Sequence, residues 1–163
     1  MLTPQEVVAR ARSAIGLHIS YKIGTGGMNP AYLSPASKEH SCDCSGFYAW
    51  AHKVSRKIEH PRYTPYFGEW LYTDAIYRDA KDPHFGFFIE IPKPALGCAI
   101  VFPKREGMKY GHVGIVSQLN PLLVIHCSHG NWADGDAILE TGPDVFRRFS
   151  AIFAWCEVVK KAV

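Results

Sequence analysis

The spacing of apolar residues changes along the chain, from a helical period in the first half to short strand-like runs in the second. Residues 3–6, Thr-Pro-Gln-Glu, have the sequence of a helix capping box, and the apolar residues that follow keep helical spacing until Gly16. A second helix is predicted over about residues 44–57, because an apolar stripe recurs there at Phe47, Trp50, Ala51, Val54 and Ile58. His52 lies off this stripe, so we expect it to face solvent.

An aromatic segment precedes a short helix predicted near residues 68–79, and we expect its rings mainly to pack in the core. From residue 85 onward, apolar runs of strand length alternate with turn signals such as Asn120-Pro121. The predicted strands cover residues 85–91, 99–102, 112–117, 122–127 and 151–159. Helices followed by strands favour an α+β fold, with N-terminal helices packed on a central antiparallel sheet.

Length and composition are those of an ordinary soluble domain. The chain has 163 residues, 47% of them apolar and 20% charged, and we expect a single domain over residues 1–163. A net charge of +3 does not indicate nucleic-acid binding. The N-terminus has neither a basic region followed by an apolar stretch nor a membrane-spanning run. We therefore expect no membrane insertion, and a protein that acts in the cytoplasm or leaves it by a non-classical export route. A monomer is the default expectation.

The start of the second predicted helix carries the first candidate for chemistry. Segment 43–47 reads Asp-Cys-Ser-Gly-Phe, so that Cys44 opens the helix. A helix N-terminus favours a thiolate over a thiol, because its unpaired N–H groups carry partial positive charge. The odd number of five cysteines argues against a disulfide scaffold, and Cys98, Cys127 and Cys156 are interpreted as structural.

Two histidines follow on neighbouring predicted strands. His112 lies between Gly111 and Gly114, which are expected to leave open space beside its ring. His126 ends the next run, which should pair with the His112 strand through a hairpin and place the two residues about 5 Å apart. A polar neighbour there can hold the His112 ring in the useful tautomer, a role for which His129 competes. Cysteine, histidine and a polar third group, in that order, indicate a cysteine hydrolase.

Two other readings stay open. A non-catalytic binding module would keep the same groove without turnover. A structural zinc site would use residues from two clusters of ligand types, namely His40, Cys42, Cys44, His126, Cys127 and His129. The spacing of Cys42 and Cys44 disfavours zinc, because one residue between ligands makes their side chains point apart in an extended chain.

The chain resembles the NlpC/P60 family of papain-like cysteine peptidases. Segment 43–47 is similar to the Asp-Cys-Ser-Gly signature of that family, residues 111–115 to its histidine strand, and residues 124–126 to the strand of its third residue. The resemblance implies a papain-like fold with the nucleophile at a helix N-terminus, and cleavage of amide bonds in peptidoglycan stem peptides. It also implies that Tyr21, Asp43 and Ser45 bind substrate.

The related CHAP amidases also fit, with His129 or Asn131 as the third group. Secreted wall-lytic effectors and phage lysins have a similar bare-domain organisation, and an inhibitor or immunity protein stays open as a partner. In the expected mechanism, a Cys44 thiolate paired with a His112 imidazolium attacks an amide carbonyl, and His126 orients His112. The Cys44 backbone N–H and the Tyr21 hydroxyl would stabilise the oxyanion. This chemistry needs no metal or cofactor.

Overall fold

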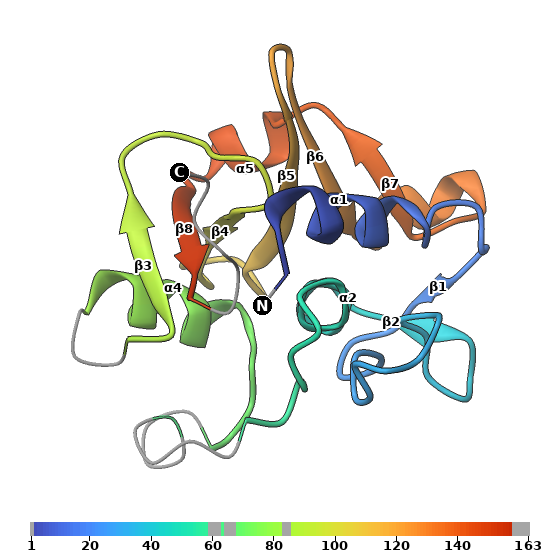
Figure 1. Ribbon diagram of the computed structural model, residues 1–163. Helices are drawn as coiled ribbons and strands as arrows, with labels where there is room; N and C mark the ends of the chain where they lie inside the picture. The colour runs from blue at the N-terminus through green and yellow to red at the C-terminus, as the bar shows by residue number, and fades with distance from the viewer. Residues whose placement is uncertain (1, 59–62, 64–67, 83–85, 158–163) are drawn as a thin grey trace.

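The computed structural model describes residues 2–58, 63, 68–82 and 86–157, and it has the predicted α+β architecture (Figure 1). Its helices are α1 (Pro4–Arg12), α2 (Cys44–Ala51), α4 (Thr73–Lys81), α5 (Asp144–Arg148) and the 3-10 helix η1 (Asn131–Asp134). Its strands are β1 (Ser20–Tyr21), β2 (Ser41–Cys42), β3 (Phe88–Ile91), β4 (Ala99–Phe102), β5 (His112–Leu119), β6 (Leu122–Cys127), β7 (Ile138–Thr141) and β8 (Ile152–Cys156).

Six of these strands form one antiparallel sheet in the order β3-β8-β4-β5-β6-β7. The predicted strands at 99–102, 112–117 and 122–127 are confirmed as β4, β5 and β6, and Asn120-Pro121 lies in the predicted turn between β5 and β6. The run at 85–91 forms β3 from Phe88, and the run at 151–159 forms β8; residues 85, 158 and 159 lie outside the described residues. Strands β1 and β2 form a separate, short parallel pair.

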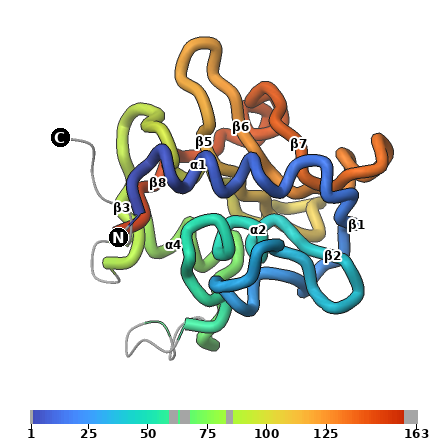
Figure 2. The backbone as a smooth tube through the Cα atoms, turned by 45° about the vertical axis from the view of Figure 1, so that its right-hand side comes forward, coloured from blue at the N-terminus to red at the C-terminus, as the bar shows by residue number. Residues whose placement is uncertain are grey.

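Helices cover both faces of the sheet. Helix α1 lies beside α2 and crosses in front of the sheet, and its Arg12 Nη2 reaches Glu140 of β7 at 2.7 Å (Figures 1 and 2). Glu140 is paired with Ile125 of β6, so the side chains of these two residues lie on the face of the sheet that α1 covers. The next residue, His126, points to the other face, where its ring meets Phe146 of α5. The candidate histidines therefore lie on the α5 face.

The first helix begins as the capping box predicts. The Thr3 hydroxyl accepts a hydrogen bond from the Glu6 backbone N–H at 3.2 Å, and the Glu6 carboxylate accepts one from the Thr3 N–H at 2.7 Å. Helix α1 ends at Arg12, and turns carry the chain through Ala14, which is fully buried, to Gly16. Sequence and structure thus agree on the first helix, apart from its last turn.

Helix α2 is shorter than predicted, and the expectation that His52 faces solvent is wrong. The helix ends at Ala51, although Ile58 beyond it is still buried. His52 is only 2% exposed because its ring stacks on Tyr48, at 4.0 Å between centroids, and its Nε2 lies 3.1 Å from the Gly97 carbonyl oxygen. The ring thus links the end of α2 to the loop before β4.

Three further elements differ from the sequence prediction. The helix expected near 68–79 is α4, shifted towards the C-terminus. Strand β7 was not predicted because two of its four residues are polar, whereas β4, of the same length, is apolar throughout. Helix α5 was not predicted because five residues are too few for a helical period to stand out. Both elements frame the histidine pair described below.

Candidate active site

Asp43 caps the start of helix α2 and ties it to the rest of the fold. Its Oδ1 accepts hydrogen bonds from the Gly46 N–H at 2.8 Å and the Ser45 hydroxyl at 3.1 Å. Its Oδ2 accepts from the Gly24 N–H at 2.7 Å and from Arg56 Nη2 at 2.6 Å, and the Asp43–Arg56 pair is buried. The carboxylate thus holds the helix start, the glycine-rich loop and the segment after α2 together.

Ser45 belongs to the same buried cluster. Its hydroxyl donates to Asp43 and accepts from Arg56 Nη2 at 3.1 Å, and the residue is 3% exposed. Asp43 is equally buried. The structure thus gives both residues a part in holding the helix start, and their direct contact with a substrate stays a prediction.

Cys44 lies at the first position of α2, directly after its cap. Burial raises the pKa of its thiol to about 12, and the neighbouring Asp43 carboxylate acts in the same direction. Hydrogen bonds from the backbone of Val113 and Ser45 lower this pKa, but they do not offset the burial. Burial therefore opposes the resting thiolate expected from the helix start, and the preformed ion pair with His112 stays a prediction.

The parallel pairing of β1 and β2 brings Tyr21 close to Cys44. Tyr21 is paired with Cys42, two residues before Cys44. Burial raises the pKa of the Tyr21 hydroxyl above its ordinary value, and the proximity of Cys44 and of the Asp43 carboxylate raises it further. The phenol is therefore a neutral hydrogen-bond donor near the sulfur.

His112 and His126 form a hydrogen-bonded pair that continues to β7. His112 Nε2 lies 2.8 Å from His126 Nδ1, and His126 Nε2 lies 2.9 Å from Thr141 Oγ1. The Thr141 hydroxyl donates its own proton to the Gly142 carbonyl at 3.0 Å, so it accepts from His126 Nε2–H. His126 Nδ1 is then the acceptor for His112 Nε2–H, which leaves His112 Nδ1 unprotonated. This series of hydrogen bonds gives His112 the tautomer with a proton on Nε2 and none on Nδ1, which is the form that a general base needs.

Thr141 belongs to this series of hydrogen bonds, and the sequence alone did not identify it. It is paired with Val124 in the β6–β7 register, so it lies on the same face as His126, which is paired with Leu139. The usable signal was the run Ile138–Thr141, in which Leu139 and Thr141 must share a face if the run is a strand. A threonine in a strand is common, and only the register makes this one a partner of histidine.

The space beside the His112 ring is filled by protein, contrary to expectation. Phe146 stacks on His112 with 5.1 Å between centroids and meets the His126 ring edge-on at 5.5 Å. A Cβ at Gly114 would lie 2.9 Å from the Phe146 ring and 2.5 Å from Val124, so this glycine makes room for Phe146. Burial lowers the pKa of His112 to about 3 and that of His126 to about 4, so both rings are neutral at pH 7.

The other candidates for the third position lie elsewhere. His129 is exposed and meets the Tyr21 ring edge-on at 6.0 Å. Asn131 uses its side-chain N–H groups to bind the His126 and Ala137 carbonyl oxygens at 3.1 and 3.2 Å. Of the three candidates, His126 is the one hydrogen-bonded to His112.

The remaining cysteines lie in the core. Cys127 points away from His126, as predicted, and its thiol donates to the Cys42 carbonyl oxygen at 3.4 Å. Cys98 and Cys156 are also buried, as predicted. Within the described part of the chain, no group of three or more His, Cys, Asp or Glu side chains is arranged to hold a metal ion.

Comparison with known proteins yields similarities of structure. No model of a known family and no curated protein matches the sequence. The structure is similar to the NlpC/p60 domain of the peptidoglycan hydrolase SagA, with a TM-score of 0.47 and 20% identity over 94% of this chain and 97% of that one. It is also similar to Ly7917, with a TM-score of 0.50 and 14% identity over 93% of this chain and 61% of that one. At this identity, the second likeness is one of fold. Among the described residues, no helix is long and apolar enough to span a membrane.

Proposed function

We propose that this protein is a cysteine hydrolase that cleaves amide bonds in the stem peptides of bacterial peptidoglycan. Cys44 is the nucleophile, His112 the general base and acid, and His126 the residue that orients His112. The observation that carries the proposal is the hydrogen-bonded chain from Gly142 through Thr141 and His126 to His112, which leaves His112 Nδ1 free to accept a proton.

The position of Cys44 supports the same assignment. Its sulfur interacts with the backbone of Val113, the residue that follows His112, which supports a nucleophile near this base at the start of β5. In the described part of the structure, the His112 ring is hydrogen-bonded to His126 and not to Cys44, so we propose that the two side chains meet when substrate binds. Because both groups are neutral, the proton moves when the substrate binds: the Cys44 thiol gives its proton to His112 Nδ1 as the sulfur attacks the carbonyl carbon. We propose this order of events in place of a preformed ion pair, because burial opposes the charge on both side chains.

The later steps use the same two residues. His112 gives the proton to the leaving amine, and the acyl group stays on Cys44 as a thioester. Water, deprotonated by His112, then releases the acid and restores the thiol. The Cys44 backbone N–H and the neutral Tyr21 hydroxyl are the donors that we assign to the oxyanion.

The choice of wall peptides as substrate rests on segments 43–47 and 111–115, whose sequences resemble the NlpC/P60 motifs. The test is to digest purified peptidoglycan and to identify the products by mass spectrometry. We expect new peptide termini within the stem with the native protein and none with Cys44→Ala. Cleavage between glycan and peptide would instead indicate an amidase, and intact peptidoglycan would refute the proposal.

A further inference from the structure

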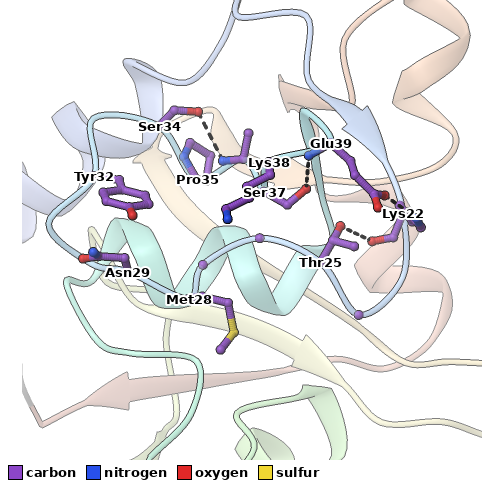
Figure 3. Close-up of a pocket in the computed structure, with 14 residues that line it drawn as sticks. Lys22, Thr25, Met28, Asn29, Tyr32, Ser34, Pro35, Ser37, Lys38 and Glu39 are labelled. Carbon is purple, nitrogen blue, oxygen red and sulfur yellow. Dashed lines mark hydrogen bonds and ion pairs between the residues drawn. The ribbon is translucent and has the colours of Figure 1, made fainter.

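A pocket of about 480 Å³ lies in the loop between β1 and β2, on the outer side of the glycine-rich segment 24–27 (Figure 3). One wall is this segment, and the opposite wall is formed by Tyr32 and residues 34–39. In Figure 3, the side chain of Lys38 lies over the middle of the pocket, between Tyr32 and Thr25. The catalytic scheme above uses none of these residues.

The pocket is held open by bonds from the core. Arg10 Nη2 donates to the carbonyl oxygens of Pro30 and Tyr32 at 2.7 and 2.9 Å, and Trp50 Nε1 donates to the Tyr32 carbonyl at 2.8 Å. The two walls are joined by a hydrogen bond from the Gly27 N–H to the Pro35 carbonyl at 2.9 Å. The pocket is therefore preformed, as most small-ligand sites are.

Close packing behind the glycine wall explains why this wall carries no side chains. A Cβ at Gly26 would lie 2.3 Å from Cys42 Sγ, and one at Gly27 would lie 2.1 Å from the Gly46 carbonyl oxygen. Both glycines also have positive φ values, +79° and +69°, which favour glycine. The wall is thus one backbone thick, and the first turn of α2 lies directly behind it.

Within the part of the chain that the structure describes, the charges that line the pocket include one cation outside any ion pair. Lys22 and Glu39 form an ion pair with each other. Lys38 is exposed, and among the described residues no carboxylate pairs with it. Met28 and Tyr32 add apolar surface at the rim, 51% and 61% exposed. A fitting ligand carries a negative group for Lys38 beside an apolar portion for these two side chains.

The pocket is also bonded to the nucleophile's helix start. The Asp43 N–H donates to the Thr25 carbonyl at 3.1 Å, and the Gly24 N–H donates to the Asp43 carboxylate at 2.7 Å. Thr25 and Gly24 line the pocket, and Asp43 precedes Cys44. One hydrogen bond thus separates the pocket wall from the residue before the proposed nucleophile, and this is the ground for placing a flanking part of the substrate in the pocket.

We propose that this pocket is a substrate subsite, in which Lys38 binds a carboxylate of the wall peptide that flanks the scissile bond. The inference rests on the proposed function for the identity of the peptide. Stem peptides carry free carboxylates, and an ammonium group with no competing partner is suited to bind one of them.

The test measures binding apart from turnover. Full-length Cys44→Ala protein is titrated calorimetrically with a stem peptide that has free carboxylates, and with the same peptide after amidation of its carboxylates. We expect amidation to weaken binding about threefold to fivefold, as for an exposed ion pair. We expect Lys38→Met to remove this difference and Lys38→Arg to keep it. Lys93→Met, which changes an exposed lysine outside the pocket, is the matched control and should leave the difference unchanged.

Several results would overturn the subsite: no binding of either peptide, equal binding of both, an amidation effect that survives in Lys38→Met, or an equal loss in Lys93→Met. Wall hydrolysis by otherwise native protein separates this inference from the proposed function. If the wall is hydrolysed but Lys38→Met leaves the binding difference between the two peptides unchanged, the subsite is refuted and the hydrolase is not. Binding that depends on Lys38 without hydrolysis refutes the hydrolase and keeps the site.

Discussion

Thr141 on β7 holds His126 on β6 through a hydrogen bond of 2.9 Å between Oγ1 and Nε2. Because the Thr141 proton is donated to Gly142, this contact fixes the positions of the protons on both histidines. The tautomer of His112 thus depends on a residue two strands away in the sheet.

Thr141→Val should lower kcat for peptide cleavage about tenfold, since the loss of one hydrogen bond of about 1.4 kcal/mol lets His126 take the wrong tautomer. KM should stay unchanged, because Thr141 is not expected to contact substrate. Thr141→Ser keeps the hydroxyl and should retain most of the activity. Steady-state kinetics on a soluble stem peptide checks this, and a valine variant with native kcat would contradict the relay.

Arg56→Met should lower the free energy of unfolding by about 3–5 kcal/mol, because it leaves the Asp43 carboxylate buried without its partner. Asparagine is a good helix cap, so Asp43→Asn combined with Arg56→Met should cost less than the two single changes added together. Urea unfolding of the four proteins measures this coupling. Additive costs would show that the two side chains do not stabilise each other.

Alkylation of Cys44 by iodoacetamide should be slow at pH 7 and should accelerate as the pH rises towards 10, because burial raises the pKa of this thiol to about 12. Peptide mapping by mass spectrometry gives the rate at each cysteine. Cys98, whose pKa burial also raises to about 12, serves as the internal comparison. A fast Cys44 reaction that reaches its plateau below pH 7 would instead indicate a resting thiolate.

The protein should lose stability as the pH falls from 7 to 5. Burial lowers the pKa of His52 to about 4, and it lowers the pKa values of His112 and His126 in the same way. In the unfolded chain these histidines have a pKa near 6.5. Between pH 7 and 5 the unfolded state therefore binds protons that the folded state does not, and the free energy of unfolding falls. Asp79 opposes them: burial raises its pKa to about 6, so the folded state gains that proton as the pH falls. The unfolded state thus binds about two more protons than the folded state, which lowers the free energy of unfolding by roughly 2.7 kcal/mol per pH unit where the dependence is steepest.

Urea midpoints across this pH range test the prediction. His52→Gln should make the pH dependence shallower by about one proton. A midpoint that stays constant or rises from pH 7 to 5 would show that these histidines are not buried as neutral rings.

The start of helix α2 was predictable from sequence because its determinants are local. An acidic cap, a small residue after the nucleophile and a helical apolar stripe all lie within segment 43–54. The pairing of the two histidine strands was equally accessible, since a short turn at Asn120-Pro121 leaves β5 and β6 little choice but to form a hairpin.

Other features depend on contacts between distant segments. His52 is buried because Gly97, far along the chain, offers a carbonyl to its ring, and helical periodicity has no access to that contact. Phe146 fills the space beside Gly114 from a helix of only five residues. The neutral state of Cys44 likewise follows from packing, because a helix start alone favours the thiolate.

Cys44 is the proposed nucleophile, and the decisive experiment is wall hydrolysis by two variants that each lack one cysteine. Cys42 is a matched control, because it is also buried and lies two residues away. With purified peptidoglycan, we expect Cys44→Ala to release no peptide products and Cys42→Ala to cleave at a rate comparable to that of the native protein. Undiminished cleavage by folded Cys44→Ala would contradict this assignment.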